Sequence, residues 1–259
     1  MLSGAINMII KFQTVAAIVA AAWLVSGCQT TSNDAASSPG TAKKELSSYM
    51  ETTTPKGAGP FPAVMMVSGC SGFNFGGGGF YDDVQANITK LGFVVVRVDS
   101  LRFRGKSRCN GGVISAREQV ADIQAASAYL QGQKNIKQGA INLLGWSWGG
   151  KGALAAAMVG KAIDAAVAYY PACENLSSNS VTVPTLILHG AADNAAKPAL
   201  CDSIVAKSKT LTRRLYPGAH HAFDNPALDP PKEYQFGTIG YNKSAAEAAW
   251  IELAKFLKH

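Results

Sequence analysis

The sequence Gly-Trp-Ser-Trp-Gly at residues 145–149 constrains the fold more than any other part of this chain. It follows an apolar run at residues 140–144, typical of a buried strand, and precedes small, helix-forming residues at 150–157. A strand that enters a helix through so sharp a turn holds Ser147 at the apex in a strained backbone conformation. The flanking glycines allow the strand and the helix to pass close to each other. The pattern therefore predicts a serine hydroxyl exposed at the end of a strand.

Two residues that can activate such a hydroxyl follow later in the chain. Asp193 lies after the apolar run at residues 184–189, and His221 lies after a short strand predicted at residues 212–216. A serine hydroxyl is a weak nucleophile unless a base takes its proton. We expect the histidine to be that base and the aspartate to fix its tautomer and stabilise the imidazolium. The order Ser147, Asp193, His221 is that of α/β-hydrolases.

The sequence leaves few alternatives for the base and the acid. The chain contains four histidines, which are His189, His220, His221 and His259. His259 is the last residue, and His189 ends a predicted strand, where a histidine more often makes a structural hydrogen bond. Of the two neighbours, His221 is favoured over His220. Glu174 follows the strand predicted at residues 164–170 and is the alternative acid, although Asp193 is favoured.

Predicted strands and helices alternate through the rest of the chain. Strands are expected at residues 62–67, 92–98, 140–144, 164–170, 184–189 and 212–216, and helices at residues 81–91, 116–130, 150–157, 198–209 and 244–257. This alternation predicts a mostly parallel sheet with helices on both faces, the α/β-hydrolase fold. Active groups then gather at the carboxyl ends of the strands. No long insertion follows residues 164–170, so we expect an open site without a large lid.

Acyl transfer also needs an oxyanion hole, formed by two backbone N–H groups aimed at the developing negative charge. One donor is expected from Trp148, the residue after the nucleophile. The other is expected from the loop after the first core strand, at residues 67–72, with Cys70 as the candidate.

The first 27 residues predict a signal peptide. Residues 8–11 give a short positive start, and the apolar run at residues 12–25 is too short to span a bilayer comfortably. The run ends in Leu-Val-Ser-Gly-Cys, which resembles a bacterial lipobox and makes Cys28 the expected lipidated residue; a chance cysteine after an ordinary signal peptide is the alternative. Gln29 after the cysteine favours the outer membrane, facing the periplasm, by the usual enterobacterial sorting pattern.

Three segments are therefore expected: a signal peptide at residues 1–27, a flexible tether at 28–44 and a hydrolase domain at 45–259. Cleavage leaves 232 residues, enough for one α/β domain with a sizeable core. Loss of Lys11 lowers the formal charge from +7 to +6. This mild, dispersed charge suits envelope surfaces or anionic substrates and does not predict nucleic-acid binding, because no basic helix accompanies it. We expect a monomer.

Four further cysteines lie in the expected domain: Cys70, Cys109, Cys173 and Cys201. An even number in an exported protein predicts two disulfides, for which three connectivities are possible. Cys70 and Cys109 follow the first two core strands, so proximity favours the pairs Cys70–Cys109 and Cys173–Cys201. Buried free thiols are the alternative. No metal site is expected, because neither C-x-x-C nor H-x-x-x-H spacing occurs.

Five ordered motifs together resemble the dienelactone hydrolase family of α/β-hydrolases, over about residues 45–258. They lie at residues 68–72, 98–105, 145–149, 190–193 and 221–224. The resemblance implies a triad of Ser147, Asp193 and His221, an oxyanion hole at Cys70 and Trp148, and no cofactor. The namesake enzymes, however, use a cysteine nucleophile in place of Ser147 and a glutamate where this chain has Gly69. These departures favour general ester hydrolysis over dienelactone.

The same resemblance suggests substrate-binding residues. Namesake enzymes bind a substrate carboxylate with arginines, and Arg102 and Arg104 lie in the matching loop, although a solvated basic loop is the alternative. Aromatic side chains near the motifs are expected to line the pocket or to be plain packing; these are Trp146, Trp148, Phe73 and Phe75.

Taken together, the sequence predicts an envelope-anchored serine hydrolase that cleaves carboxylic esters, with lactones as further substrates, through an acyl-enzyme. Its expected partners are a small ester and the membrane through lipidated Cys28. One alternative is a small-substrate peptidase, which is disfavoured because no propeller domain precedes the expected fold. The other is a non-catalytic lipoprotein that binds a ligand with the same fold.

Overall fold

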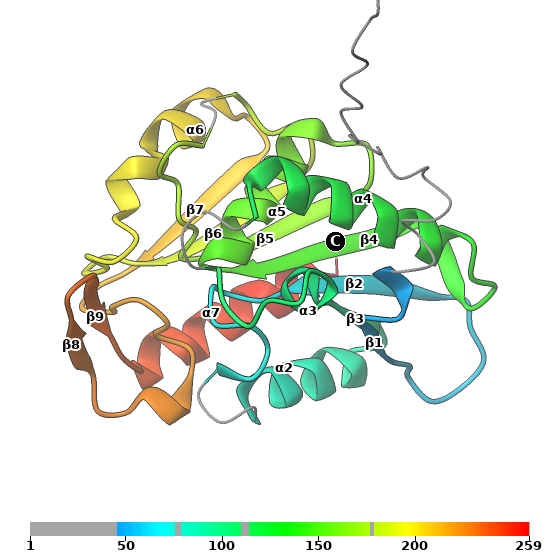
Figure 1. The fold of residues 1–259 in the computed structure, drawn as a ribbon, viewed down its shortest axis with the longest axis horizontal. Helices are drawn as coiled ribbons and strands as arrows, with labels where there is room; N and C mark the ends of the chain where they lie inside the picture. Colours follow the sequence, from blue (N-terminus) through cyan, green and yellow to red (C-terminus); the bar gives the residue numbers. More distant parts are fainter. Residues whose placement is uncertain (1–45, 76–78, 110–113, 177–178, 259) are drawn as a thin grey trace, which may run out of the picture. The chain divides into compact units, whose positions relative to one another are not determined.

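A seven-stranded sheet organises the part of the chain that the computed structural model describes, residues 46–75, 79–109, 114–176 and 179–258. The strand order is β1-β3-β2-β4-β5-β6-β7 (Figure 1). Only β1 is antiparallel to its neighbour, and the other strands run parallel. The strands are β1 (Met50–Thr53), β2 (Phe61–Val67), β3 (Val94–Val98), β4 (Ile136–Trp146), β5 (Ala165–Tyr169), β6 (Thr185–Gly190) and β7 (Leu211–Tyr216).

Helices cover both faces of this sheet (Figure 1). On one face, α4 (Ala116–Gln131), α5 (Trp148–Val159) and α6 (Asp202–Lys207) contribute to one hydrophobic cluster. On the other, α2 (Gly79–Lys90) and α7 (Lys243–Phe256) contribute to a second cluster. The predicted α/β-hydrolase fold, mostly parallel with helices on both faces, is confirmed.

The inner strands read as continuous apolar runs because both of their faces are buried. Along β2, Ala63 and Met65 face the α4–α5 side, whereas Val64 and Met66 face the α2–α7 side. Alternate side chains of a strand point to opposite faces, so each strand supplies both cores. Full burial of a side chain as large as Val64 or Met65 stabilises the fold by about 1.5–3 kcal/mol.

A few elements differ from the sequence prediction. The edge strand β1 and a small hairpin of β8 (Lys232–Tyr234) and β9 (Gly237–Ile239) were not predicted, because strands of three or four residues are too short to show a period. The helix expected at residues 198–209 is divided into a 3₁₀ turn, η3 (Pro198–Cys201), and the α6 helix. Short helical turns also occur at α3 (Ser100–Phe103) and η4 (Pro226–Leu228).

Two glycines allow α5 to lie directly against the sheet. A Cβ atom at Gly149 would overlap the backbone carbonyls of Val67 and Ser68, and one at Gly145 would overlap the carbonyl of Gly149. The turn between β4 and α5 therefore has no room for any larger side chain at either position. This is the close approach that the flanking glycines predict.

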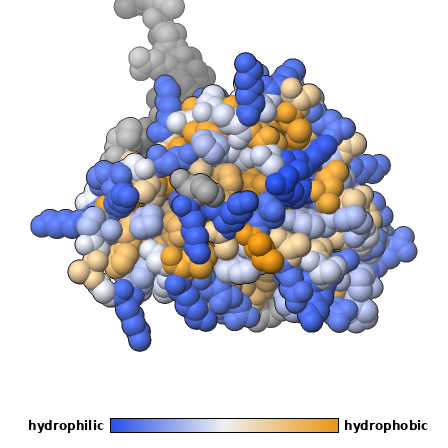
Figure 2. Space-filling view, turned by 180° about the vertical axis from the view of Figure 1, so that it is seen from behind, coloured by the Kyte–Doolittle hydropathy of each residue, from blue (hydrophilic) through white to orange (hydrophobic). Residues whose placement is uncertain are grey.

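On the face shown in Figure 2, small hydrophobic areas lie among hydrophilic side chains. Among the helices of the described residues, none has the length and apolar character needed to cross a membrane. The expected signal peptide, the tether and Cys28 lie outside the described residues.

Candidate active site

Ser147 occupies a strained position between β4 and α5. Its φ of 53° and ψ of −113° place a non-glycine residue at positive φ, which costs of order 1–3 kcal/mol. Neighbouring backbone groups hold it there: its N–H donates to the Tyr169 carbonyl (2.9 Å), and its own carbonyl accepts from the N–H groups of Lys151 (2.9 Å) and Ala172 (3.2 Å). The Ser147 side chain therefore projects from the turn at the end of β4.

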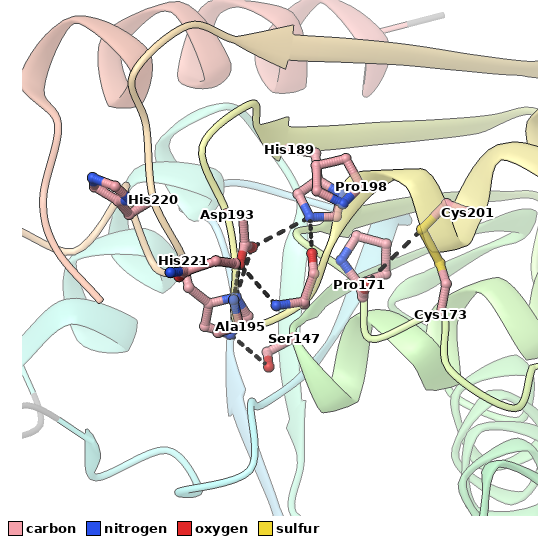
Figure 3. Close-up of polar contacts among 12 residues, drawn as sticks. Ser147, Pro171, Cys173, His189, Asp193, Ala195, Pro198, Cys201, His220 and His221 are labelled. Atoms are coloured by element: carbon pink, nitrogen blue, oxygen red, sulfur yellow. Dashed lines mark hydrogen bonds and ion pairs between the residues drawn. A yellow bond between two sulfur atoms is a disulfide. The ribbon is translucent and has the colours of Figure 1, made fainter. Parts of the chain in front are cut away.

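His221 joins this serine to an acid (Figure 3). Its Nε2 lies 2.9 Å from Ser147 Oγ, and its Nδ1 lies 2.8 Å from Asp193 Oδ2. Both distances are within the range for hydrogen bonds between a nucleophile, its base and the group that orients the base. Asp193 follows β6 and His221 follows β7, so parallel pairing of these strands brings both loops to one edge of the sheet.

Asp193 is held as an ionised carboxylate. Its Oδ1 accepts from the backbone N–H groups of Ala195 (2.9 Å) and Ala196 (2.8 Å), and Nε2 of buried His189 lies 3.3 Å from Oδ2. Burial raises the pKa of Asp193, but hydrogen bonds from His189 and His221 outweigh it and hold the pKa well below its usual range. A charged acid can then stabilise a protonated imidazole.

The alternatives for the base and the acid lie elsewhere. Figure 3 shows the His220 side chain turned away from Ser147, and its Nδ1 lies 3.1 Å from the Ala192 carbonyl. Asp193, not Glu174, is hydrogen-bonded to His221. His189 makes the kind of structural contact expected of it, with Nε2 2.7 Å from the Ala196 carbonyl.

The two expected oxyanion donors lie beside Ser147. Trp148 is the first residue of α5, and the first N–H groups of a helix have no acceptor within the helix. Cys70 lies within a turn closed by the Gly72 N–H and the Gly69 carbonyl (3.1 Å), and a Cβ atom at Gly69 would lie 3.6 Å from Ser147 Cβ. The turn therefore packs directly against the serine.

Tyr81 on α2 supports this turn and was missed at the sequence level. Its hydroxyl accepts a hydrogen bond from the Gly69 N–H at 3.0 Å. No sequence pattern links a tyrosine on a helix to a backbone N–H of the preceding loop, although Tyr81 lies on the apolar side of the predicted helix.

A cavity of about 610 Å³ opens beside Ser147 and His221. Cys70 and Trp146 line it, as does Phe75, while Trp148 is not among its lining residues. The Trp148 side chain instead contacts Gln119 on α4. The Gln119 amide oxygen faces α5 and accepts a hydrogen bond from the Trp148 indole N–H at 3.2 Å.

The expected arginines do not line this cavity. Arg104 is paired with buried Asp122 on α4, with a guanidinium–carboxylate distance of 2.9 Å. Arg102 lines a neighbouring cavity of about 490 Å³. Arg108, in the same loop, lines both cavities.

Phe73 does not line the cavity beside Ser147, and its contacts are those of the packing alternative. Its ring packs edge-on against Tyr81, with centroids 5.1 Å apart, and lies beneath the Arg97 guanidinium at 5.5 Å. Phe73 lines the smaller, neighbouring cavity and serves mainly as packing under the loop after β2.

A second carboxyl group, that of Asp224, contacts a side chain that packs against His221. Asp224 Oδ1 accepts from the Tyr170 hydroxyl (2.7 Å), and Oδ2 accepts from the Trp146 indole N–H (2.9 Å). The Tyr170 ring packs edge-on against His221, with centroids 4.7 Å apart. Burial raises the pKa of Asp224 to about 6, although the bonds from Tyr170 and Trp146 oppose the shift.

Both expected disulfides are present. Cys70–Cys109 joins the loops after β2 and β3, with Cα atoms 4.8 Å apart, and Cys173–Cys201 joins the loop after β5 to η3, with Cα atoms 5.3 Å apart. The Cys109 N–H also donates to the Cys70 carbonyl at 2.9 Å. The first bridge thus fixes the turn that packs against Ser147. In the described ranges, no cluster of three or more potential ligands could hold a metal ion.

The fold and the serine–histidine–aspartate hydrogen bonds define an α/β-hydrolase. The sequence model of the Dienelactone hydrolase family matches residues 49–259, so the chain belongs to this family of hydrolases.

Individual relatives agree with this assignment. A protein of Methylorubrum extorquens named "Putative carboxymethylenebutenolidase" is 27% identical over 194 residues, and the match spans 65% of this chain and 65% of that relative's length. Among solved structures, the "Putative Dienelactone Hydrolase" of Klebsiella pneumoniae has a TM-score of 0.68 at 17% identity, covering 81% of this chain and 92% of that one. The metagenomic dienelactone hydrolase-like phosphotriesterase P91 has a TM-score of 0.65 at 17% identity, covering 81% and 91%. At these identities the structures support the fold.

Replacement of Asp224 by Asn is expected to make the protein more stable relative to the wild type as pH rises from 4 to 7. Asp224 has a pKa of about 6 in the folded protein and about 3.9 when unfolded, so its contribution is fully present below about pH 4 and is lost as pH rises through about 6. The amide keeps the shape and stays neutral. Urea unfolding of Asp224→Asn and the wild type from pH 4 to 7 should show a difference in unfolding free energy that moves in favour of the variant by on the order of 2 kcal/mol. A constant difference would contradict this.

Proposed function

We propose that this protein is a serine hydrolase that cleaves carboxylic esters, and lactones by the same steps, through an acyl-enzyme. The observation that carries the proposal is His221 bridging Ser147 and Asp193 at 2.9 and 2.8 Å, beside an open cavity of about 610 Å³. A non-catalytic binding module would not need an ordered proton path from a strained serine to an ionised acid.

In the proposed reaction, Ser147 Oγ attacks the ester carbonyl carbon while His221 Nε2 takes its proton. The ionised Asp193 stabilises the imidazolium through Nδ1. The backbone N–H groups of Cys70 and Trp148 donate to the carbonyl oxygen as it becomes negative, and the N-terminal end of α5 adds a favourable dipole. His221 then gives the proton to the departing alcohol. A water molecule, deprotonated by His221, releases the acid and restores Ser147.

Ester hydrolysis is favoured over the chemistry of the family's namesake because of two residues. The chain has Ser147 in place of the namesake's cysteine and Gly69 in place of its glutamate. With glycine at this position, the turn carries no acid near the nucleophile. The Gly69 N–H donates to the Tyr81 hydroxyl. The relative named as a carboxymethylenebutenolidase makes lactones the second class to test. A panel of esters, lactones and dipeptide substrates separates esterase, lactonase and peptidase activity.

Ser147→Ala is expected to abolish hydrolysis of p-nitrophenyl acetate and to leave the fold intact. Loss of the nucleophile typically lowers kcat by about 10⁴–10⁶. His221→Ala should be similarly damaging, whereas the neighbouring His220→Ala serves as a matched control and should be mild. Steady-state rates and circular dichroism of the three variants provide the measurement. Activity of Ser147→Ala within about tenfold of the wild type would exclude the proposed nucleophile.

The two disulfides provide a second test. They close loops of similar length, 39 and 28 residues apart, so their removal should lower the unfolding free energy similarly, by roughly 3–4 kcal/mol. Serine replacement of Cys70 and Cys109 should also lower kcat, by about ten- to a hundredfold, because it loosens an oxyanion donor. Replacement of Cys173 and Cys201 should act mainly on stability. Equal effects of both pairs on kcat would contradict the role of Cys70.

We also propose that the protein is anchored in the bacterial envelope by lipidated Cys28, facing the periplasm, with residues 1–27 removed. Wild-type protein expressed in an enterobacterial host should partition with membranes, and Cys28→Ser should be soluble or unprocessed. Stable anchoring needs more than one acyl chain, as bacterial lipoproteins carry. Fractionation and N-terminal mass spectrometry test this, and a soluble wild type with an unmodified N-terminus would overturn it.

A further inference from the structure

The β8–β9 hairpin carries two exposed aromatic side chains at the catalytic cavity. Tyr234 is 45% exposed and Phe236 is 62% exposed, yet both line the cavity that contains Ser147. Their rings stack on each other, with centroids 5.4 Å apart and planes 14° from parallel. Neighbouring large apolar side chains left in water at a cavity mark a surface that binds a ligand.

The hairpin is fastened to the loops that carry the acid and the base. The His221 N–H donates to the Thr238 carbonyl (3.3 Å), and the Gly240 N–H donates to the His221 carbonyl (3.0 Å). The Thr238 N–H donates to Asn194 Oδ1, next to Asp193, at 2.7 Å. The aromatic pair is therefore held in a fixed relation to the His221 imidazole.

The position of His221 decides which half of an ester meets this pair. In acyl transfer, His221 Nε2 first takes the proton of Ser147 and then gives it to the leaving oxygen, so that oxygen lies within hydrogen-bond reach of Nε2. The alcohol half of the ester therefore starts at His221. The loop carrying Cys70 instead packs against Ser147 from the end of β2 and carries the expected oxyanion donor.

The lining near the hairpin fits an aromatic group. Ile239 belongs to β9, and Ala195 packs against Gly237 of the same hairpin; both line the cavity and add only apolar side chains to Tyr234 and Phe236. A flat ring can stack on or meet edge-on the exposed aromatic pair, which adds to the free energy gained by apolar burial. A small aliphatic alcohol would leave this surface in water.

We propose that Tyr234 and Phe236 make the enzyme selective for esters whose alcohol half is aromatic, such as benzyl or aryl esters. The inference rests on the proposed acyl-enzyme function, because that mechanism assigns the alcohol half to the His221 side of the cavity.

Two isomeric esters test the proposal directly. Benzyl acetate carries its ring on the alcohol half, and methyl phenylacetate carries the same ring on the acyl half. Phe236→Ala and Tyr234→Ala should each lower kcat/KM for benzyl acetate by about three- to tenfold and change methyl phenylacetate far less. Hydrolysis is followed by acid release in a pH-stat, with each variant compared with the wild type on the same ester.

Ile251→Ala is the matched control, because Ile251 is 66% exposed on α7 and lies outside the cavity lining; it should change neither ester. Equal losses on both esters, a larger loss on methyl phenylacetate, or no loss would overturn the inference. Labelling by a fluorophosphonate probe separates the two hypotheses. If the wild type neither reacts with the probe nor cleaves either ester, the proposed function itself fails. Labelled, active variants without the selective loss overturn the inference alone.

Discussion

The positive φ of Ser147 is the constraint on which the candidate active site depends. A non-glycine residue holds such a conformation only when its surroundings over-determine it. Here the Tyr169 carbonyl at the end of β5 accepts the Ser147 N–H, and the absence of side chains at Gly145 and Gly149 lets α5 press against β2. The buried parallel sheet therefore stabilises the strained turn. The same packing places the first N–H of α5 beside the serine, so the proposed nucleophile and one proposed oxyanion donor come from one local feature.

Parallel pairing supplies the other half of the site. In the register of β6 with β7, His189 is opposite Leu215, so the two strands end together and deliver Asp193 and His221 to the same edge. The register also positions His189, whose buried Nε2 contacts Asp193 Oδ2 and the Ala196 carbonyl. A slip of β6 by one residue would exchange the faces of its side chains and remove these contacts.

Local patterns made the sheet, both disulfide pairs and the contacts among Ser147, Asp193 and His221 predictable, because each strand and turn has its own signature and the sheet edge brings strand ends together. Contacts made by residues outside a recognised motif were not predictable. Nothing in the sequence joins Tyr81 to Gly69, or Asp224 to Trp146. The expectation for Arg104 failed for the same reason: its partner Asp122 lies on α4, and a buried carboxylate draws the guanidinium away from the cavity.

The two carboxyl groups near His221 show how surroundings separate the properties of like residues. Asp193 receives backbone and imidazole hydrogen bonds that hold it ionised. At Asp224 the cost of burial outweighs the hydrogen bonds that the carboxyl accepts, chiefly from the Tyr170 hydroxyl and the Trp146 indole, and its pKa rises to about 6. Asp193 contacts the imidazole directly, whereas Asp224 contacts Tyr170, whose ring packs against His221. At neutral pH both carboxyl groups carry negative charge, and below about pH 6 only Asp193 does. Trp146 and Tyr170, the two side chains that donate to Asp224, also line the cavity beside Ser147.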